Sequence, residues 1–217
     1  MSSIPPRATL AKILLGVAEE AAALVKEGHR SRPHADEKAR ADLVTSFDRA
    51  SEDLIVARLR ALVPGIPIVG EEASGGATSP RSGPVLYVDP IDGTTNFVHG
   101  HPFWCVSIGL AEEDEPVVGA VVAPVLGVSW VGAVGSESEP AWVLRNGDPC
   151  HVSGTARLAE AMIATGFPPD RERAPDNNFD SFIAVKKRAR AVRRCGSAAI
   201  DLCFVADGTY DGFWERR

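Results

Sequence analysis

The sequence predicts a layered α/β protein with two β-sheets, and three observations support this fold class. Apolar residues recur at helical spacing near the start of the chain, which indicates a pair of helices. Apolar runs separated by turn residues fill the middle, a pattern typical of an antiparallel meander. Strand and helix patterns alternate in the last third. With 45% hydrophobic and 24% charged residues, the 217-residue chain has the composition of an ordinary globular protein.

The chain begins with the predicted helix pair. The first helix is expected over Ala8–Lys26, where apolar residues return every three or four positions and Gly28 follows as a stop. The polar residues 30–41 predict a loop. The second helix is expected over Phe47–Leu62, because Pro64-Gly65 ends its apolar pattern.

The elements expected next are a short strand at 66–70, a Gly/Ser/Pro-rich loop at 73–84, a buried strand at 85–89 and a meander at 104–152. Glu71 and Glu72 directly follow the first of these strands. Within the meander, Asn146-Gly147 predicts a tight hairpin turn.

The last third predicts a second, smaller sheet. Its expected elements are strands at 162–165, 189–194 and 210–215 and helices at 178–188 and 197–206. We therefore divide the chain into an N-terminal layer at 1–154, with the helix pair, meander and metal site, and a C-terminal α/β layer at 155–217. The second layer is expected to be incomplete, which would leave a sheet edge uncovered.

The segment most informative about chemistry is Asp89-Pro90-Ile91-Asp92-Gly93-Thr94. Asp89 ends an apolar strand, so its carboxylate is expected at the carboxyl edge of the sheet, where α/β proteins place their sites. Pro90 disfavours a helical conformation at Asp89, so both aspartates are presented from a sharp turn. Gly93 permits close backbone approach, and Thr94 opens a helix whose free N–H groups suit a phosphate.

Two aspartates this close repel each other unless they share a proton or bind a metal, and an exposed strand end favours the metal. Glu71 and Glu72 can supply further carboxylates. An all-oxygen ligand set indicates a hard cation, Mg²⁺ before Ca²⁺ or Mn²⁺, and hence phosphoryl chemistry. The alternative is a capped turn in which Asp89 and Asp92 bond only to backbone N–H groups.

Asp89–Phe97 resembles the Asp-Pro-x-Asp-Gly-Thr-x-x-Phe signature of the inositol monophosphatase family. Four other motifs of that family are similar and occur in the same order: Leu43-Val44-Thr45-x-x-Asp48, Gly70-Glu71-Glu72, Gly196-Ser197-Ala198-Ala199 and Tyr210–Glu215. The similarity extends from about residue 10 to residue 217. It implies an alternating α-β-α-β-α sandwich.

The resemblance implies a role for each matching residue. The residues that would hold Mg²⁺ are Glu71, Asp89, Asp92 and, through its carbonyl, Ile91. Glu71 and Thr94 would orient the attacking water, and Asp48 joins them in the catalytic set. The substrate would contact the backbone of Gly93, Thr94 and Ala198 and the carboxylate of Glu215.

The implied reaction is in-line attack by a metal-bound water, with two or three Mg²⁺ ions and inhibition by lithium. The family pattern continues to a Trp-Asp-x-Ala-Gly motif whose aspartate binds the second metal, and this motif does not occur in the 217 residues. We therefore expect a fragment in which one metal site and the end of the second α/β layer are incomplete.

The expected function is hydrolysis of a small polyol or sugar phosphate, myo-inositol monophosphate first, because Thr95–Gly100 resembles the inositol branch. Alternatives are a histidinol-phosphate or fructose-1,6-bisphosphate phosphatase, or a non-catalytic protein that binds a phosphorylated ligand or a partner. The resemblance implies a homodimer. A net charge of −6 argues against a nucleic-acid partner. The charged first helix is neither a signal peptide nor a membrane span, which predicts a cytoplasmic protein.

Overall fold

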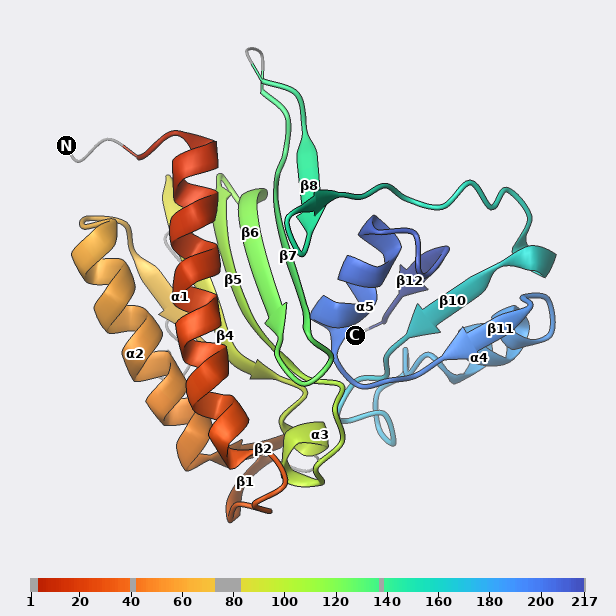
Figure 1. Ribbon diagram of the computed structural model, residues 1–217. Helices are drawn as coiled ribbons and strands as arrows, with labels where there is room; N and C mark the ends of the chain where they lie inside the picture. The colour runs from red at the N-terminus through yellow and green to blue at the C-terminus, as the bar shows by residue number, and fades with distance from the viewer. Residues whose placement is uncertain (1–3, 40–41, 73–82, 137–138, 217) are drawn as a thin grey trace.

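Figure 1 shows a computed structural model of the chain, which describes residues 4–39, 42–72, 83–136 and 139–216. Helices α1 (Arg7–Gly28) and α2 (Ser46–Leu62) cover one face of a large sheet. Helix α5 (Ala198–Ala206) packs between this sheet and a smaller one. The layered α/β fold predicted from the sequence is confirmed.

The helix pair forms because its apolar stripes meet the large sheet. Leu10 and Leu14 of α1 and Ile55 of α2 are fully buried in one core with the strands. Thr45 and Asp48 start α2 with a reciprocal capping box. The Thr45 side chain accepts a backbone N–H from the first turn of the helix, and the Asp48 side chain accepts the backbone N–H of Thr45. Both predicted helices are confirmed, with boundaries that differ by at most two residues.

The prediction of a loop over residues 30–41 is wrong in part. Strands β1 (Ala35–Ala39) and β2 (Asp42–Thr45) pair antiparallel and lead directly into α2. The residues of β1 are largely polar, and this strand pairs with β2 through backbone hydrogen bonds, whereas β2 buries Val44 and Thr45. The polar pattern therefore concealed the strands.

The large sheet has seven strands in the order β3-β4-β5-β6-β7-β8-β9. Their bounds are β3 Ile68–Gly70, β4 Pro84–Asp92, β5 Cys105–Glu112, β6 Glu115–Ala123, β7 Val128–Ala133, β8 Trp142–Arg145 and β9 Asp148–Pro149. Only β3 and β4 pair parallel, and the remainder form the predicted meander. Asn146 and Gly147 have φ of 50° and 87°, the left-handed pair that a tight hairpin turn requires.

The small sheet is parallel, with β10 (Met162–Thr165) between β11 (Ala191–Arg193) and β12 (Gly212–Trp214). A short 3₁₀ turn, Leu158–Glu160, precedes it, and α4 (Phe179–Lys186) joins β10 to β11. The predicted strands and helices of this region are confirmed, although β11 and β12 are shorter than expected. The predicted loop at 73–84 lies almost wholly outside the described residues, and the division into two domains stays a prediction.

Candidate active site

A bulge at the end of β4 places both aspartates on one face of the sheet. Asp89 lies opposite Ser107 of β5 and Asp92 lies opposite Cys105, so β4 advances three residues while β5 advances two. Because Ser107 and Cys105 share a face, their partners Asp89 and Asp92 share it as well. This is the face that α5 covers and that α1 and α2 do not.

Gly93 makes the turn that follows the bulge. Its φ of 99° lies in the left-handed region, and a Cβ there would lie 3.1 Å from the carbonyl oxygens of both Gly196 and Phe103. Helix α3 (Thr94–Val98) starts at the next residue. The N–H groups of its first turn have no helical acceptor and remain available to an anion.

Thr94 links α3 to the start of α2. Its hydroxyl lies 3.1 Å from Oδ1 of Asp48 and 3.0 Å from the carbonyl oxygen of Ile91, and it can donate to one of them at a time. Oδ2 of Asp48 accepts from the Thr45 N–H at 2.8 Å and from the Thr45 hydroxyl at 2.6 Å. Asp48 is 1% exposed. The buried carboxylate that caps α2 therefore also holds the Thr94 hydroxyl in place.

Glu71 is held beside β4 by its backbone, whose N–H donates to the Val88 carbonyl at 3.2 Å. The turn that carries it rests on Glu52 of α2, a buried carboxylate that accepts the Glu72 N–H at 2.8 Å. The Glu52 carboxylate fills the space that a Cβ on Gly70 would need. Sequence reasoning missed Glu52, because only the tertiary packing of α2 brings it under the Gly-Glu-Glu turn.

The acidic side chains of the site lie close enough together to change the pKa of Asp89. Burial raises the pKa of Asp89 well above its ordinary value, and the nearby carboxylates of Asp92 and Glu71 raise it further. A hydrogen bond between the Asp89 and Glu71 carboxyls, which only a protonated carboxyl can donate, also raises the pKa of Asp89. A backbone bond opposes the shift, since Oδ1 of Asp89 accepts the Ile91 N–H at 3.1 Å.

Asp92 joins the signature turn to the N-terminus of α5. Its Oδ2 accepts from the Ser197 hydroxyl and from the Ala199 N–H, each at 2.7 Å. Burial raises the pKa of Asp92, and these bonds to Ser197 and to the α5 backbone act against the rise. Ala198 is the first residue of α5 and therefore lies directly beside this carboxylate.

Asn96 of α3 links the loop before α5 to the signature turn through hydrogen bonds. Its side-chain amide donates to the carbonyl oxygen of Phe103 at 2.6 Å and to that of Cys195 at 2.8 Å, and it lies 3.4 Å from the Gly196 oxygen. Sequence reasoning assigned no role to Asn96. The position of Asn96 within the signature is a signal, but two of its partners, Cys195 and Gly196, lie about a hundred residues away in the chain.

Glu215 and Asp201 are two further carboxylates near Asp92. Glu215 follows β12 and packs against Gly166, where a Cβ would collide with its carboxylate. Burial raises the pKa of Glu215, Arg194 lowers it and Asp92 raises it. Asp201, one helical turn after Ala198, is 2% exposed, and burial raises its pKa to about 7, with Asp92 and Glu215 adding to the rise.

A divalent cation fits the Asp89 end of this arrangement. Burial and the carboxylates of Asp92 and Glu71 raise the pKa of Asp89, and a bound cation would balance this negative charge. Within the described part of the chain, however, no three acidic, His or Cys side chains are close enough to form a complete metal cluster. Asp92 is directed to α5, so Asp89 and Glu71 fit as a partial oxygen site of the kind that Mg²⁺ completes with water and substrate phosphate.

The structure therefore places the predicted residues in two groups. Glu71, Asp89, the Ile91 carbonyl, Thr94 and Asp48 form one continuous set of contacts, and Ala198 and Glu215 both lie near Asp92. The capped-turn alternative is also visible, since Asp89 and Asp92 each accept a backbone N–H. These bonds leave the second Asp89 oxygen for Glu71 or a cation.

Comparison with known proteins decides the family. The sequence profile described as "Inositol monophosphatase family" matches residues 7–217. The chain belongs to the inositol monophosphatase family. Membership confirms the predicted phosphatase class, and the roles of individual site residues stay predictions.

Similar proteins agree in sequence and in fold. Inositol monophosphatase 3 of Solanum lycopersicum is 37% identical over 206 residues, which are 94% of this chain and 75% of the relative. Inositol-1-monophosphatase of Synechocystis is 41% identical over 182 residues, 83% of this chain and 61% of the relative. The structure of inositol monophosphatase from Anabaena matches with a TM-score of 0.83 and 35% identity, over 96% of this chain and 75% of that one.

Among the helices of the described residues, none combines the length and the apolar character that crossing a bilayer requires.

Proposed function

We propose that this phosphatase is Mg²⁺-dependent and hydrolyses a small polyol monophosphate, with myo-inositol monophosphate as the first candidate. The observation that supports the proposal most directly is the pairing of Asp89 with Glu71 at the edge of the sheet, between the start of α3 and the N-terminus of α5. A phosphate can there meet backbone donors on one side and a carboxylate pair on the other. The family's named members supply the substrate class.

In this proposal the backbone N–H groups of Gly93 and Thr94 bind the phosphate. Glu71 accepts a proton from the attacking water, and the Thr94 hydroxyl, held by Asp48, orients that water. Mg²⁺ would be held by Glu71, Asp89 and the Ile91 carbonyl, with Asp92, whose Oδ2 also accepts hydrogen bonds from α5, as the fourth ligand. It would supply Lewis-acid stabilisation of the phosphoryl oxygens and acidify the water.

The alcohol part of the substrate occupies the other side of Asp92. The backbone of Ala198 and the carboxylate of Glu215 receive its hydroxyl groups, which restricts the site to alcohols that carry several hydroxyls. Histidinol phosphate and fructose 1,6-bisphosphate are the alternative substrates. We include in the proposal two or three Mg²⁺ ions, inhibition by lithium, a homodimer and a cytoplasmic location.

The test is phosphate release from myo-inositol 1-phosphate, with and without Mg²⁺, for the wild type, Asp89→Asn and Asp53→Asn. Asp53 is an exposed aspartate of α2 outside the site, so it controls for the loss of a carboxylate. We expect Mg²⁺-dependent release that Asp89→Asn abolishes and Asp53→Asn retains.

Three results would contradict parts of the proposal. Faster turnover of histidinol phosphate or fructose 1,6-bisphosphate would show that this ester, and not myo-inositol monophosphate, is the substrate. Phosphate release that does not depend on Mg²⁺ would contradict the proposed role of the metal. A folded chain that binds inorganic phosphate in calorimetry but releases none from any of these esters would be the non-catalytic alternative.

A further inference from the structure

Asp92 is bound to the N-terminus of α5 through one of its two carboxylate oxygens. Its Oδ2 accepts the Ser197 hydroxyl and the Ala199 N–H, each at 2.7 Å. The Cys105 thiol lies 4.0 Å from the same oxygen. Among the residues that the structure describes, no side-chain hydrogen bond ends on Oδ1. The two oxygens of this carboxylate therefore have different surroundings.

The Ser197 hydroxyl directs its proton to Asp92. Ser197 is the N-cap of α5, and its oxygen accepts the Ile200 N–H at 3.4 Å. A hydroxyl has one proton to donate, and a carboxylate oxygen at 2.7 Å is a better acceptor than the Cys105 sulfur at 3.6 Å. Ser197 is 1% exposed, so water has little access to this proton. One side chain thus caps the helix and holds the carboxylate.

Helix α5 is itself held at both ends, so it is a fixed support for the carboxylate. Before the helix, the Asn96 amide donates to the Cys195 carbonyl oxygen at 2.8 Å. After the helix, Oδ2 of the C-cap residue Asp207 accepts the Trp130 Nε1–H at 2.9 Å and lies 3.3 Å from Nη1 of Arg145. Trp130 and Arg145 belong to β7 and β8. The helix is therefore tied to the signature turn at one end and to the large sheet at the other.

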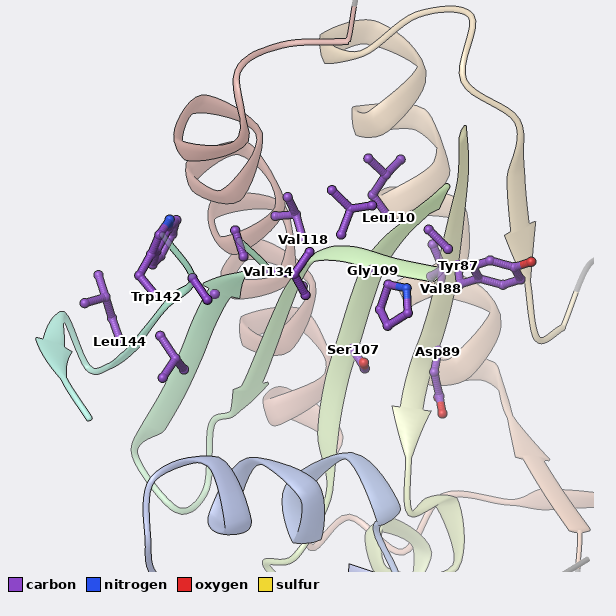
Figure 2. A pocket seen from close by; sticks show the side chains of 18 of the residues that line it. Tyr87, Val88, Asp89, Ser107, Gly109, Leu110, Val118, Val134, Trp142 and Leu144 are labelled. Carbon is purple, nitrogen blue, oxygen red and sulfur yellow. The ribbon is translucent and has the colours of Figure 1, made fainter. Parts of the chain in front are cut away.

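The acidic group is open on its other side. The residues that line a cavity of about 960 Å³ include Glu71, Asp89 and Ser107. Figure 2 shows the Asp89 and Ser107 side chains directed toward the end of the sheet where α5, in pale blue, lies. The charge of Asp92 raises the pKa of Asp89, so the two carboxylates are close together. A cation that Asp89 binds from the cavity therefore has Oδ1 of Asp92 as the oxygen that no side chain occupies.

A carboxylate with one available oxygen is a different ligand from a carboxylate with two. Ca²⁺ binds carboxylates through one or both oxygens and tolerates a flexible, larger ligand set, whereas Mg²⁺ requires a near-ideal octahedron. A carboxylate that is tied down at Oδ2 offers a cation only its other oxygen. This arrangement of Asp92 suits Mg²⁺ and denies Ca²⁺ a second contact.

We propose that Ser197 is a positioning residue that makes Asp92 a one-oxygen ligand and thereby makes the site select Mg²⁺ over Ca²⁺. This inference rests on the Mg²⁺ site of the proposed function. Ser197 acts through Asp92 and does not itself touch the cation. Removal of its hydroxyl leaves Oδ2 with the Ala199 N–H, so the carboxylate can rotate and present both oxygens.

The test measures metal binding directly, on the full chain and without substrate. Free Mn²⁺ is followed by electron paramagnetic resonance while Mg²⁺ or Ca²⁺ displaces it, which gives a dissociation constant for each cation. Ser197→Ala removes the hydroxyl, Ser197→Gly removes it at a cap position that tolerates glycine, and Ser197→Thr keeps it. The control is Ser153→Ala, because the Ser153 hydroxyl also donates to an aspartate, Oδ1 of Asp211 at 2.6 Å, outside the site.

We expect Ser197→Ala and Ser197→Gly to raise the dissociation constant for Mg²⁺ about tenfold, as is typical when a ligand loses its hydrogen-bond partner. The constant for Ca²⁺ should stay the same or fall, so that the preference for Mg²⁺ is lost. Ser197→Thr and Ser153→Ala should bind both cations as the wild type does. A loss of structure alone would weaken both cations alike, so the ratio of the two constants separates positioning from folding.

An equal change for both cations in Ser197→Ala and Ser197→Gly overturns the proposal, as does an unchanged constant for Mg²⁺. A folded wild type that binds no Mn²⁺ also overturns it. Phosphate release is measured separately. The expected change in selectivity, found in a chain that releases no phosphate from myo-inositol 1-phosphate, supports this inference and contradicts the proposed function alone.

Discussion

Asp201 should make the stability of this protein depend on pH in a way that one substitution removes. The Asp201 carboxyl is 2% exposed, and burial raises its pKa from 3.8 to about 7. Asp92 and Glu215 add to the rise and Arg194 opposes it. Because the folded chain then binds this proton more tightly than the unfolded chain, the group costs stability as pH rises from about 4 to about 7, and the cost is constant above that range.

The size of the effect follows from the shift. One pKa unit corresponds to about 1.4 kcal/mol, so a rise of about three units costs about 4 kcal/mol once the pH exceeds 7. About 1.5 kcal/mol of this cost is present at pH 5, so about 2.5 kcal/mol develops between pH 5 and pH 8. Asp201→Asn has no charge to desolvate and should lose this part of the pH dependence.

The assay is urea unfolding at pH 5 and pH 8 in metal-free buffer, followed by tryptophan fluorescence, for the wild type, Asp201→Asn and Asp53→Asn. The exposed Asp53 variant measures what the loss of an ordinary carboxylate does. We expect the free energy of unfolding of the wild type to fall by about 2.5 kcal/mol more than that of Asp201→Asn. Equal falls in the two proteins would refute the reasoning, because Asp201 would then titrate alike in the folded and unfolded states.

Three further substitutions test the site. Asp48→Asn should lower kcat for myo-inositol 1-phosphate roughly tenfold or more, because it weakens the hold on the Thr94 hydroxyl, with Asp53→Asn unchanged; equal rates would remove Asp48 from the catalytic set. Asn96→Ala should cost about 2–3 kcal/mol in urea unfolding, since carbonyls on both sides of the site lose a donor; a cost below about 0.5 kcal/mol would contradict this. Gly93→Ala should lower the melting temperature in a thermal melt, because its φ of 99° and two carbonyl oxygens at 3.1 Å oppose a Cβ; an unchanged value would show that the turn relaxes.

Much of the fold could be predicted because its signals are local. The apolar period of α1 and α2, the Asn146-Gly147 turn and the strand at Met162–Thr165 depend on residues near one another in the chain. The two strands at residues 35–45 were missed because their pairing uses the backbone alone. The boundary of β4 was set too early, since the bulge that extends it to Asp92 depends on the neighbouring strand.

The sequence by itself determined the family, the phosphatase class and the residues of the signature turn, because these are written as short motifs in a definite order. Only the tertiary structure decided how they meet. Glu52 under the Glu71 turn, Asn96 on the Cys195 carbonyl and Asp92 on the cap of α5 join positions 20 to 107 residues apart. The alignment of Gly109 of β5, Gly119 of β6 and Gly132 of β7 at one level of the sheet is equally invisible in the sequence, because contacts at such separations arise from packing and leave no periodic pattern along the chain.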